Sequence, residues 1–263
     1  MKRTILITGA GTGIGRDSAF ALAMRGHSVL ATTQTEEQAR ALREEAAQKN
    51  AVLQVFKLDI TQDQDRQSIA DLSLDVLINN AGVGESGSLA EVDIERIRQV
   101  FEVNVFSTLA LTQIALRGMI ARQRGTVLFV SSIAGRLPMP FLMPYGMSKF
   151  ALSAGGAALR EEIDQLGKNV HIALIEPGAI FTGFNQAMMA RKYTWMGPSS
   201  YFAGHVEKIK RQEGQVFKWL EASSTDSIVR QIVKATEAKR PKLRYVAPWL
   251  QGFGVRLARI LGV

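Results

Sequence analysis

The sequence predicts an α/β protein: a doubly wound, mostly parallel seven-stranded sheet with helices on both faces, in three α/β/α layers. Short apolar runs alternate with longer amphipathic stretches from the first residues onward. A repeat of strand, helix and strand joins parallel strands through right-handed crossovers. Most of the short runs are continuously apolar rather than alternating, as expected for parallel strands that are buried on both faces.

Seven apolar runs are expected to form the strands. In chain order they are Thr4–Thr8, Ser28–Thr32, Val52–Leu58, Val76–Asn79, Thr126–Ser131, Val170–Glu176 and Leu243–Val246. The amphipathic stretches predict helices near residues 14–26, 35–49, 62–72, 90–124, 145–167 and 225–238. One helix start has a specific signature, because Thr35 and Gln38 have the spacing of a capping box. Glu36 and Glu37 then fall in the first turn, where the helix dipole favours acids.

The chain is expected to form one domain over residues 1–263. No linker, low-complexity tract or internal repeat divides it. Within this domain, residues 183–225 are expected to form a substrate lid region. Residues 246–263 are expected to pack as a C-terminal segment.

The composition excludes several classes of site. The chain has no cysteine, so disulfides, thiolate nucleophiles and cysteine-bound metals are excluded. His27, His171 and His205 are far apart, and we expect no metal site. The net charge of +8 favours anionic ligands, but no segment supplies the clustered basic face of a nucleic-acid-binding protein. The first apolar run stops at Gly9, too early for a signal peptide, and no run reaches the roughly 18 apolar residues of a membrane span. We therefore expect a cytoplasmic protein.

A glycine-rich loop, Thr8–Arg16, joins the first strand to the first helix. Gly9, Gly13 and Gly15 allow a tight turn and let backbone amides approach a pyrophosphate. The helix that follows presents its N-terminal dipole to the same anion. The spacing is not the usual G-x-G-x-x-G, because Ile14 stands where the last glycine belongs, and no P-loop lysine follows. The loop favours a dinucleotide, with a purely structural turn as the alternative.

The second strand indicates which dinucleotide the loop would hold. An acid at its end would bind the adenosine ribose hydroxyls and repel a 2′-phosphate. Here Thr33 and Gln34 follow the strand and carry no acid. Arg16 could pair with a 2′-phosphate, although Asp17 beside it weakens that argument and Arg16 could equally be a surface residue. We favour NADP(H), with NAD as the alternative.

Three residues are candidates for the chemistry. Tyr145 and Lys149 lie four apart, on one face of a predicted helix. A lysine ammonium near a phenol stabilises the phenolate, so we expect it to lower the pKa of Tyr145. Ser132 follows the fifth strand, at the sheet edge where ligands bind in open α/β sheets, and can donate to a substrate oxygen. The alternatives are a surface Tyr–Lys pair and a serine that only ends a strand.

The motifs together resemble the single-domain branch of the short-chain dehydrogenase/reductase family. Six signatures occur in family order between residue 4 and about residue 182. They are Thr8–Gly15 (T-G-x-x-x-G-x-G), Asn79–Gly82 (N-N-A-G), Asn104, Ser132, Tyr145-x-x-x-Lys149, and Pro177-Gly178 with Thr182. The resemblance implies a Rossmann-type fold and an NAD(P)-dependent oxidoreductase that interconverts a carbonyl and an alcohol.

The resemblance also implies roles for individual residues. Tyr145 would be the general acid/base, Lys149 would hold the nicotinamide ribose and lower the tyrosine pKa, and Ser132 would orient the substrate oxygen. Asn104 would support a water that connects Lys149 to solvent, and Asp59 would contact the adenine. The implied cofactor site comprises Gly9, Gly11, Thr12, Gly13, Ile14, Gly15, Arg16, Thr33, Gln34, Asp59, Ile60, Asn80, Ala81, Gly82, Tyr145, Lys149, Pro177, Gly178, Ile180 and Thr182.

The region after Thr182 is expected to set the substrate. Methionine and aromatic side chains suit a lid over a bulky apolar substrate, or equally packing beneath the lid. These residues are Met188, Met189, Tyr193, Trp195, Met196, Tyr201 and Phe202. The segment Pro144–Leu152 resembles members of the family that act on steroids, retinoids and similar lipids. We therefore expect such a substrate, with a dinucleotide-sensing protein and a lyase or epimerase on the same fold as alternatives.

Further expectations concern assembly and contact with a membrane. Residues 245–263 could form an amphipathic helix that touches a membrane, but we favour packing against a neighbouring subunit or the lid. The family commonly assembles through two long helices, which Ser107–Arg124 and Tyr145–Gly167 match. We expect a homodimer or homotetramer.

Overall fold

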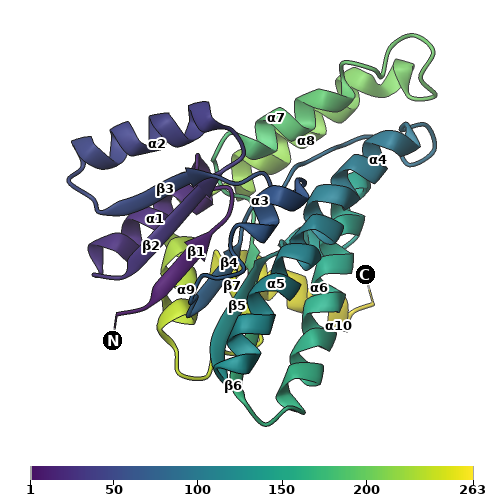
Figure 1. Cartoon of the computed structure of the whole chain (residues 1–263). Coiled ribbons are helices and arrows are strands. Elements are labelled where there is room, and N and C mark those ends of the chain that lie inside the picture. The colour runs from purple at the N-terminus through teal and green to yellow at the C-terminus, as the bar shows by residue number, and fades with distance from the viewer. Residues whose placement is uncertain (1, 263) are drawn as a thin grey trace.

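A computed structural model of the chain describes residues 2–262 and contains one seven-stranded sheet (Figure 1). The strands lie in the order β3-β2-β1-β4-β5-β6-β7, and every adjacent pair is parallel. The prediction of a doubly wound sheet is confirmed, with the correction that no strand is antiparallel. The strands are β1 (Thr4–Ile7), β2 (Ser28–Thr33), β3 (Leu53–Lys57), β4 (Val76–Asn79), β5 (Arg124–Val130), β6 (Asn169–Pro177) and β7 (Arg244–Ala247).

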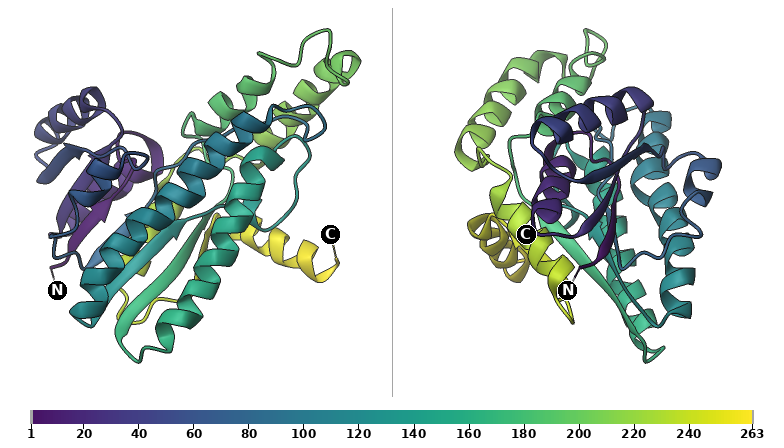
Figure 2. Two further views of the ribbon diagram at one scale, coloured as in Figure 1. Left: turned by 45° about the vertical axis from the view of Figure 1, so that its right-hand side comes forward. Right: turned by 60° about the vertical axis from the view of Figure 1, so that its left-hand side comes forward.

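Helices cover both faces of this sheet (Figures 1 and 2). They are α1 (Gly13–Met24), α2 (Glu36–Gln48), α3 (Asp63–Gln67), α4 (Ile94–Phe101), α5 (Thr108–Ala121), α6 (Met143–Asp164), α7 (Phe184–Lys192), α8 (Val206–Leu220), α9 (Asp226–Glu237) and α10 (Trp249–Ile260). The capping box of α2 is present, with the Thr35 hydroxyl accepting from Gln38 N at 3.2 Å.

Two helix predictions need correction. The stretch 62–72 contains only the short helix α3, because the chain turns toward β4 after it. The stretch 90–124 is not one regular helix. It begins at Ile94, where the Asp93 side chain accepts from Glu95 N at 2.9 Å. A six-residue π turn, Glu102–Ser107, then separates α4 from α5.

The two faces of the sheet carry separate cores. Ile5 and Ile7 of β1 pack with residues of α1, α2 and α9 on one face, whereas Leu6 packs with residues of α5 and α6 on the other. Side chains alternate between faces along a strand, so a strand buried on both faces is apolar throughout. This explains the continuous apolar runs in the sequence.

The segment from Ile94 to Ala121 is long and apolar enough to cross a membrane by length and composition. It passes on the mean hydropathy of an 18-residue window, whereas the sequence prediction concerned an unbroken run of about 18 apolar residues, which this segment does not contain. Just over half of its apolar window, 56%, is buried inside the protein. Leu111 and Met119 belong to the core beneath the sheet, which accounts for the apolar character without a bilayer.

The site-bearing loops gather at the carboxyl ends of the strands. The helices α7 and α8 extend beyond this edge, and α10 lies on the outside of the molecule next to β7 (Figures 1 and 2). The order β3-β2-β1-β4-β5 places the reversal of strand order between β1 and β4, although all these strands run parallel. Ligands bind at such a switch point in open α/β sheets.

Candidate active site

A cavity of about 590 Å³ opens at the carboxyl ends of the central strands. Its lining comes from the loops after β1, β2, β3, β4, β5 and β6, and from α6, α7, α8 and α10. The structure brings all but three of the predicted site residues into this lining. The three outside it are Arg16, Thr33 and Asn104.

The glycine-rich loop forms one wall, and its close contacts require glycine at two positions. Gly9 has a left-handed φ of +64°, and a Cβ there would lie 2.8 Å from Ala81 Cα. A Cβ at Gly15 would lie 2.3 Å from the Asn80 amide nitrogen. Gly11 has no positive φ, and a Cβ there would lie 3.6 Å from its nearest neighbour, a methyl carbon of Thr33. The glycine-rich loop is therefore held close to the β4 loop, and its backbone amides lie at the amino end of α1.

Asn80 ties the β4 loop to the glycine-rich loop. Its side-chain amide donates to Thr8 O and to Gly9 O, both at 2.9 Å. The Thr8 hydroxyl accepts from Asn80 N and Ala81 N, both at 3.0 Å. These bonds span the two strands that flank the switch point. Asn80 and Ala81 thus fix the floor on which a dinucleotide would lie.

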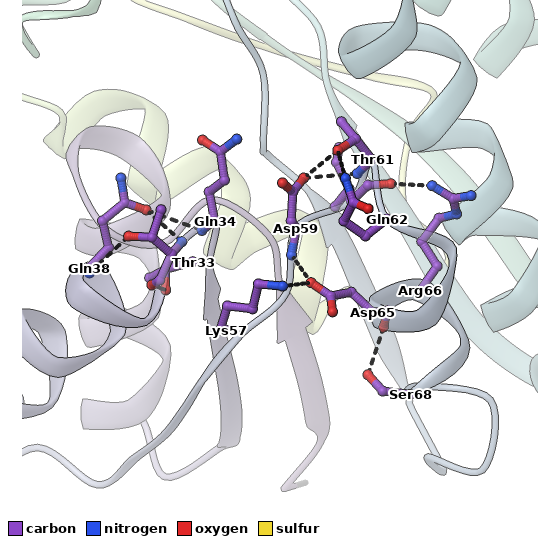
Figure 3. A network of polar contacts seen from close by, with 12 residues as sticks. Thr33, Gln34, Gln38, Lys57, Asp59, Thr61, Gln62, Asp65, Arg66 and Ser68 are labelled. Atoms are coloured by element: carbon purple, nitrogen blue, oxygen red, sulfur yellow. Dashed lines mark hydrogen bonds and ion pairs between the residues drawn. The ribbon is translucent and has the colours of Figure 1, made fainter.

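Gln34, Asp59 and two further residues line the end of the cavity near β2 and β3 (Figure 3). Asp59 Oδ1 accepts from the amide and the hydroxyl of Thr61, at 3.0 and 2.8 Å. Gln38 Oε1 accepts from Gln34 N at 3.1 Å. Thr61 and Gln38 were not predicted as site residues. Gln38 could have been found, because its capping box turns its side chain back toward the end of β2.

Arg16 is engaged elsewhere. Its Nε lies 3.0 Å from Asp17 Oδ1, and its Nη1 lies 3.9 Å from Glu45 Oε1. Asp17 in turn accepts from the Thr225 hydroxyl at 2.6 Å. Since Arg16 is outside the cavity lining and already has two acidic neighbours, its geometry gives no support to a 2′-phosphate contact.

The opposite end of the cavity holds the candidate catalytic group. Pro144 stands in the first turn of α6, where a missing amide hydrogen costs no helix bond. One turn of this helix then places Tyr145 and Lys149 on the cavity side, where both line it with Ser132. Ser132 follows β5, and its hydroxyl accepts from Ala134 N at 3.0 Å.

The electrostatics of this group correct one expectation. Lys149 Nζ donates to Val130 O at 2.9 Å and lies 5.6 Å from the centre of the Tyr145 ring. Burial raises the pKa of Tyr145, and a hydrogen bond with Ser132 opposes this only in part. The prediction that Lys149 lowers the pKa of Tyr145 is therefore wrong for this arrangement. Burial instead lowers the pKa of Lys149 to about 8.

Asn104 lies behind the site and is fully buried. The π turn directs its amide to the β4 loop, where Oδ1 accepts from Val83 N and Nδ2 donates to Val83 O, both at 2.9 Å. Nδ2 also donates to the Ser148 hydroxyl at 2.9 Å. Asn104 therefore joins α6 to the β4 loop from a position outside the cavity.

The outer wall is apolar. Met188 and Phe184 of α7 pack with Tyr145, whose ring centre lies 5.7 Å from that of Phe184. Of the seven methionine and aromatic side chains predicted to cover the substrate, Met188 lines the cavity and the other six do not. Trp195, for example, packs on Gly87, and the Tyr193 hydroxyl donates to Glu213 at 2.6 Å. These two side chains therefore contact other parts of the protein and not the cavity.

Within residues 2–262, no group of three or more histidine, aspartate or glutamate side chains is arranged to hold a metal ion. The chain contains no cysteine that could add a ligand.

Comparison with known sequences points to one family. A sequence model described as short chain dehydrogenase matches residues 3–192. The chain is 34% identical to an uncharacterized oxidoreductase, YusZ, of Bacillus subtilis over 79% of its own length and 76% of that protein. It is 30% identical to retinol dehydrogenase 8 of Bos taurus, over 92% and 80% of the two chains. Identity to 17-beta-hydroxysteroid dehydrogenase 13 of Rattus norvegicus is 28%, over 82% and 74%.

Solved structures agree on the fold. A short-chain dehydrogenase/reductase of Burkholderia phymatum in complex with NAD superposes with a TM-score of 0.82 at 22% identity, over 98% of this chain and 93% of that chain. A short-chain dehydrogenase of Sphingobium yanoikuyae in complex with NADPH gives a TM-score of 0.71 at 20% identity, over 99% and 96%. At these identities the likeness concerns the fold alone.

Proposed function

Because this chain belongs to the short-chain dehydrogenase family and is an NAD(P)-dependent oxidoreductase, we propose that it interconverts a carbonyl and an alcohol on a bulky apolar substrate. The observation that carries this proposal is the grouping of Ser132, Tyr145 and Lys149 on one cavity whose outer wall is apolar. The names of the retinol and hydroxysteroid relatives support a lipid-like substrate.

The residues present fit a dinucleotide. Gly9 and Gly15 let the loop pack directly on Ala81 and Asn80, where any side chain would clash, and the amino end of α1 favours an anion beside this loop. Asp59 and Thr61 suit the adenine end, while Lys149 lies at the opposite end, where it would hold the nicotinamide ribose. When bound, the nicotinamide would supply or accept the hydride.

The protein's own residues would manage the proton. In reduction, the Tyr145 hydroxyl would give its proton to the carbonyl oxygen and become a phenolate, and in oxidation that phenolate would take the proton from the alcohol and become the hydroxyl again. The Ser132 hydroxyl would donate to the same oxygen and orient it. The buried, neutral phenol is suited to the role of acid, because burial keeps its proton on. Asn104 is placed to hold Ser148 and the start of α6 in position.

We propose NADP(H) as the preferred cofactor, with NAD as the alternative. At the β2 end of the cavity the lining residues Gln34 and Gln38 are neutral. Thr33 and Gln34, at the end of β2, supply no carboxylate that would repel a 2′-phosphate, and the Asp59 carboxylate, which follows β3, accepts from Thr61. The proposed preference for NADP(H) is argued from the absence of an acid at the end of β2 and not from Arg16.

The remaining proposals concern organisation. Residues 1–263 would act as a single catalytic domain, with 183–225 as the lid and 246–263 as a C-terminal segment, in the cytoplasm.

A homodimer or homotetramer would form through α5 and α6, where Phe106 is exposed beside α5 and the surroundings of Gly155 are open. Light scattering of the purified protein measures this assembly directly.

The test is oxidation of NADPH with a panel of ketones and aldehydes, from small acetoacetyl esters to steroids and retinal. A parallel series uses NADH. Turnover that favours the bulky apolar compounds supports the proposal. Tight dinucleotide binding without turnover of any compound would favour a dinucleotide-sensing protein instead. A bound dinucleotide that assists a reaction without net redox change would indicate a lyase or an epimerase.

A further inference from the structure

The helix α10 presents an uncovered apolar face. Its side chains on this face are between 47% and 81% exposed. Placed about 100° apart along the helix, they all fall within an arc of about 120°. They are Trp249, Leu250, Phe253, Leu257, Ile260 and, just past the helix end, Leu261.

The opposite face fixes the helix to the protein body. Gly252 and Val255 are buried, and a Cβ at Gly252 would lie 2.7 Å from a methyl carbon of Val246. The Gln251 side chain accepts from Ala179 N at 2.8 Å and donates to Leu220 O at 2.6 Å. The outer face is thus held in place as a rigid apolar surface.

This surface continues to the mouth of the cavity. Leu220 and Val216 of α8 line the cavity and are half exposed, and Trp219 between them is 85% exposed. Gln251 of α10 lines the same cavity. The bond from Gln251 to Leu220 O holds the start of α10 beside the end of α8, so the exposed apolar side chains of the two helix ends form one apolar rim beside the opening.

The exposed charges beside the rim are mostly positive, and Glu221, which follows Leu220, is half-buried and accepts from Asn185 and Gln186. Arg256 borders one edge of the apolar arc of α10, Arg259 lies further round on the same side, Lys218 is next to Trp219 in the sequence, and all three are exposed. No acidic residue occurs in the chain from residue 238 to residue 263. An apolar helix face with arginines along one side is the pattern of a helix that lies in the interface of an anionic bilayer.

We propose that α10 and the end of α8 dock on an anionic lipid surface, so that an apolar substrate enters the cavity from the lipid. The second half of this inference rests on the proposed function, whereas the docking itself does not. The earlier expectation that residues 246–263 only pack against protein is replaced by this proposal. Trp249, Phe253 and Ile260 would enter the lipid, and Arg256 and Arg259 would meet the headgroups.

The test is co-sedimentation of the full chain with vesicles. One set contains phosphatidylcholine alone, and in the other about a third of the lipid is phosphatidylserine. We expect binding to the anionic vesicles that weakens as salt is raised. The triple variant Phe253→Ser/Leu257→Ser/Ile260→Ser should bind roughly tenfold or more weakly, since the apolar area that enters the lipid is lost. Arg256→Gln/Arg259→Gln should lose most of the preference for anionic lipid.

Matched controls separate the explanations. Met24→Ser/Val52→Ser removes two equally exposed apolar side chains, 84% and 85% exposed, that lie away from the rim near β3, and should bind as the parent does. Unchanged thermal melting confirms that each variant is folded. Equal binding by the triple variant and the parent, or no binding by the parent, overturns the proposal.

Two further readouts distinguish the other possibilities. A fall in molecular mass of the triple variant by light scattering, with no vesicle binding by the parent, identifies a second copy as the true occupant. Turnover of a small water-soluble carbonyl, measured without vesicles, should be equal in the parent and the triple variant. Absence of turnover of every carbonyl of the panel in both proteins would count against the proposed function, and vesicle binding would still decide the docking.

Discussion

The ammonium of Lys149 donates to the carbonyl oxygen of Val130 at 2.9 Å, which ties the first turns of α6 to the last residue of β5. This contact connects the helix that carries Tyr145 to the strand that leads into Ser132. Both partners are buried. The lysine therefore serves the architecture of the site as well as its chemistry.

The burial of Lys149 predicts a pH dependence of stability. Burial lowers its pKa from the ordinary value of 10.5 to about 8. Between these values the unfolded chain binds more protons than the folded one, so this group makes stability rise with pH across the window. Urea unfolding of the parent should show a rise of about 2–3 kcal/mol from pH 8 to pH 10 that Lys149→Met lacks. Equal pH profiles of the two proteins would contradict this reading.

The glycine-rich loop offers a matched pair of substitutions. Gly9→Ala puts a methyl group against Ala81 at a φ of +64°, which costs about 1–3 kcal/mol in backbone strain alone. It should also displace the loop and weaken dinucleotide binding. Gly11→Ala meets its nearest neighbour only at 3.6 Å and should melt like the parent. Calorimetric melting measures the effect on stability, and fluorescence titration with NADPH measures the effect on binding. Equal melting temperatures and equal NADPH affinities of the two variants would contradict the close packing of Gly9 on Ala81.

Asn104→Ala removes three hydrogen bonds from a fully buried position. Val83 and Ser148 are then left with unpaired groups, and we expect a loss of about 2–4 kcal/mol in the free energy of unfolding. Asn169→Ala, at an exposed residue with one side-chain bond to His171, is the control and should change stability little. If Asn104→Ala lowers the free energy of unfolding no more than the control does, Asn104 does not position the β4 loop and α6.

The end of β2 tests cofactor choice. Gln34 lines the cavity without a charge, so Gln34→Asp should add a carboxylate that repels a 2′-phosphate and shift preference toward NADH. Gln34→Arg should shift it further toward NADPH. The ratio of kcat/KM for the two cofactors is the readout. If the aspartate variant kept the parent ratio, position 34 would have no part in the choice.

The parts of this site that could be predicted are the ones encoded by local spacing. The positions of Gly9, Gly13 and Gly15 follow from a single turn, and Tyr145 and Lys149 share a face because they are one helical turn apart. Buried parallel strands were equally legible, since a strand such as Thr4–Ile7 has to be apolar on both faces.

The parts that could not be predicted depend on partners that are distant in sequence. Arg16 turns to Asp17 and to Glu45, and nothing near residue 16 signals the second partner. The π turn around Asn104 is set by its bonds to Val83 and Ser148 rather than by its own propensity. The pKa of Tyr145 follows from burial, which spacing alone does not reveal.

The central claim is that Tyr145 is the acid and base of a carbonyl–alcohol conversion. The most direct measurement compares the parent with Tyr145→Phe, using NADPH and the best apolar carbonyl of the panel, with dinucleotide affinity measured in parallel. We predict a fall in kcat of about 10²–10⁴-fold, with NADPH affinity and melting temperature close to those of the parent. Turnover by Tyr145→Phe at the parent rate would contradict the claim.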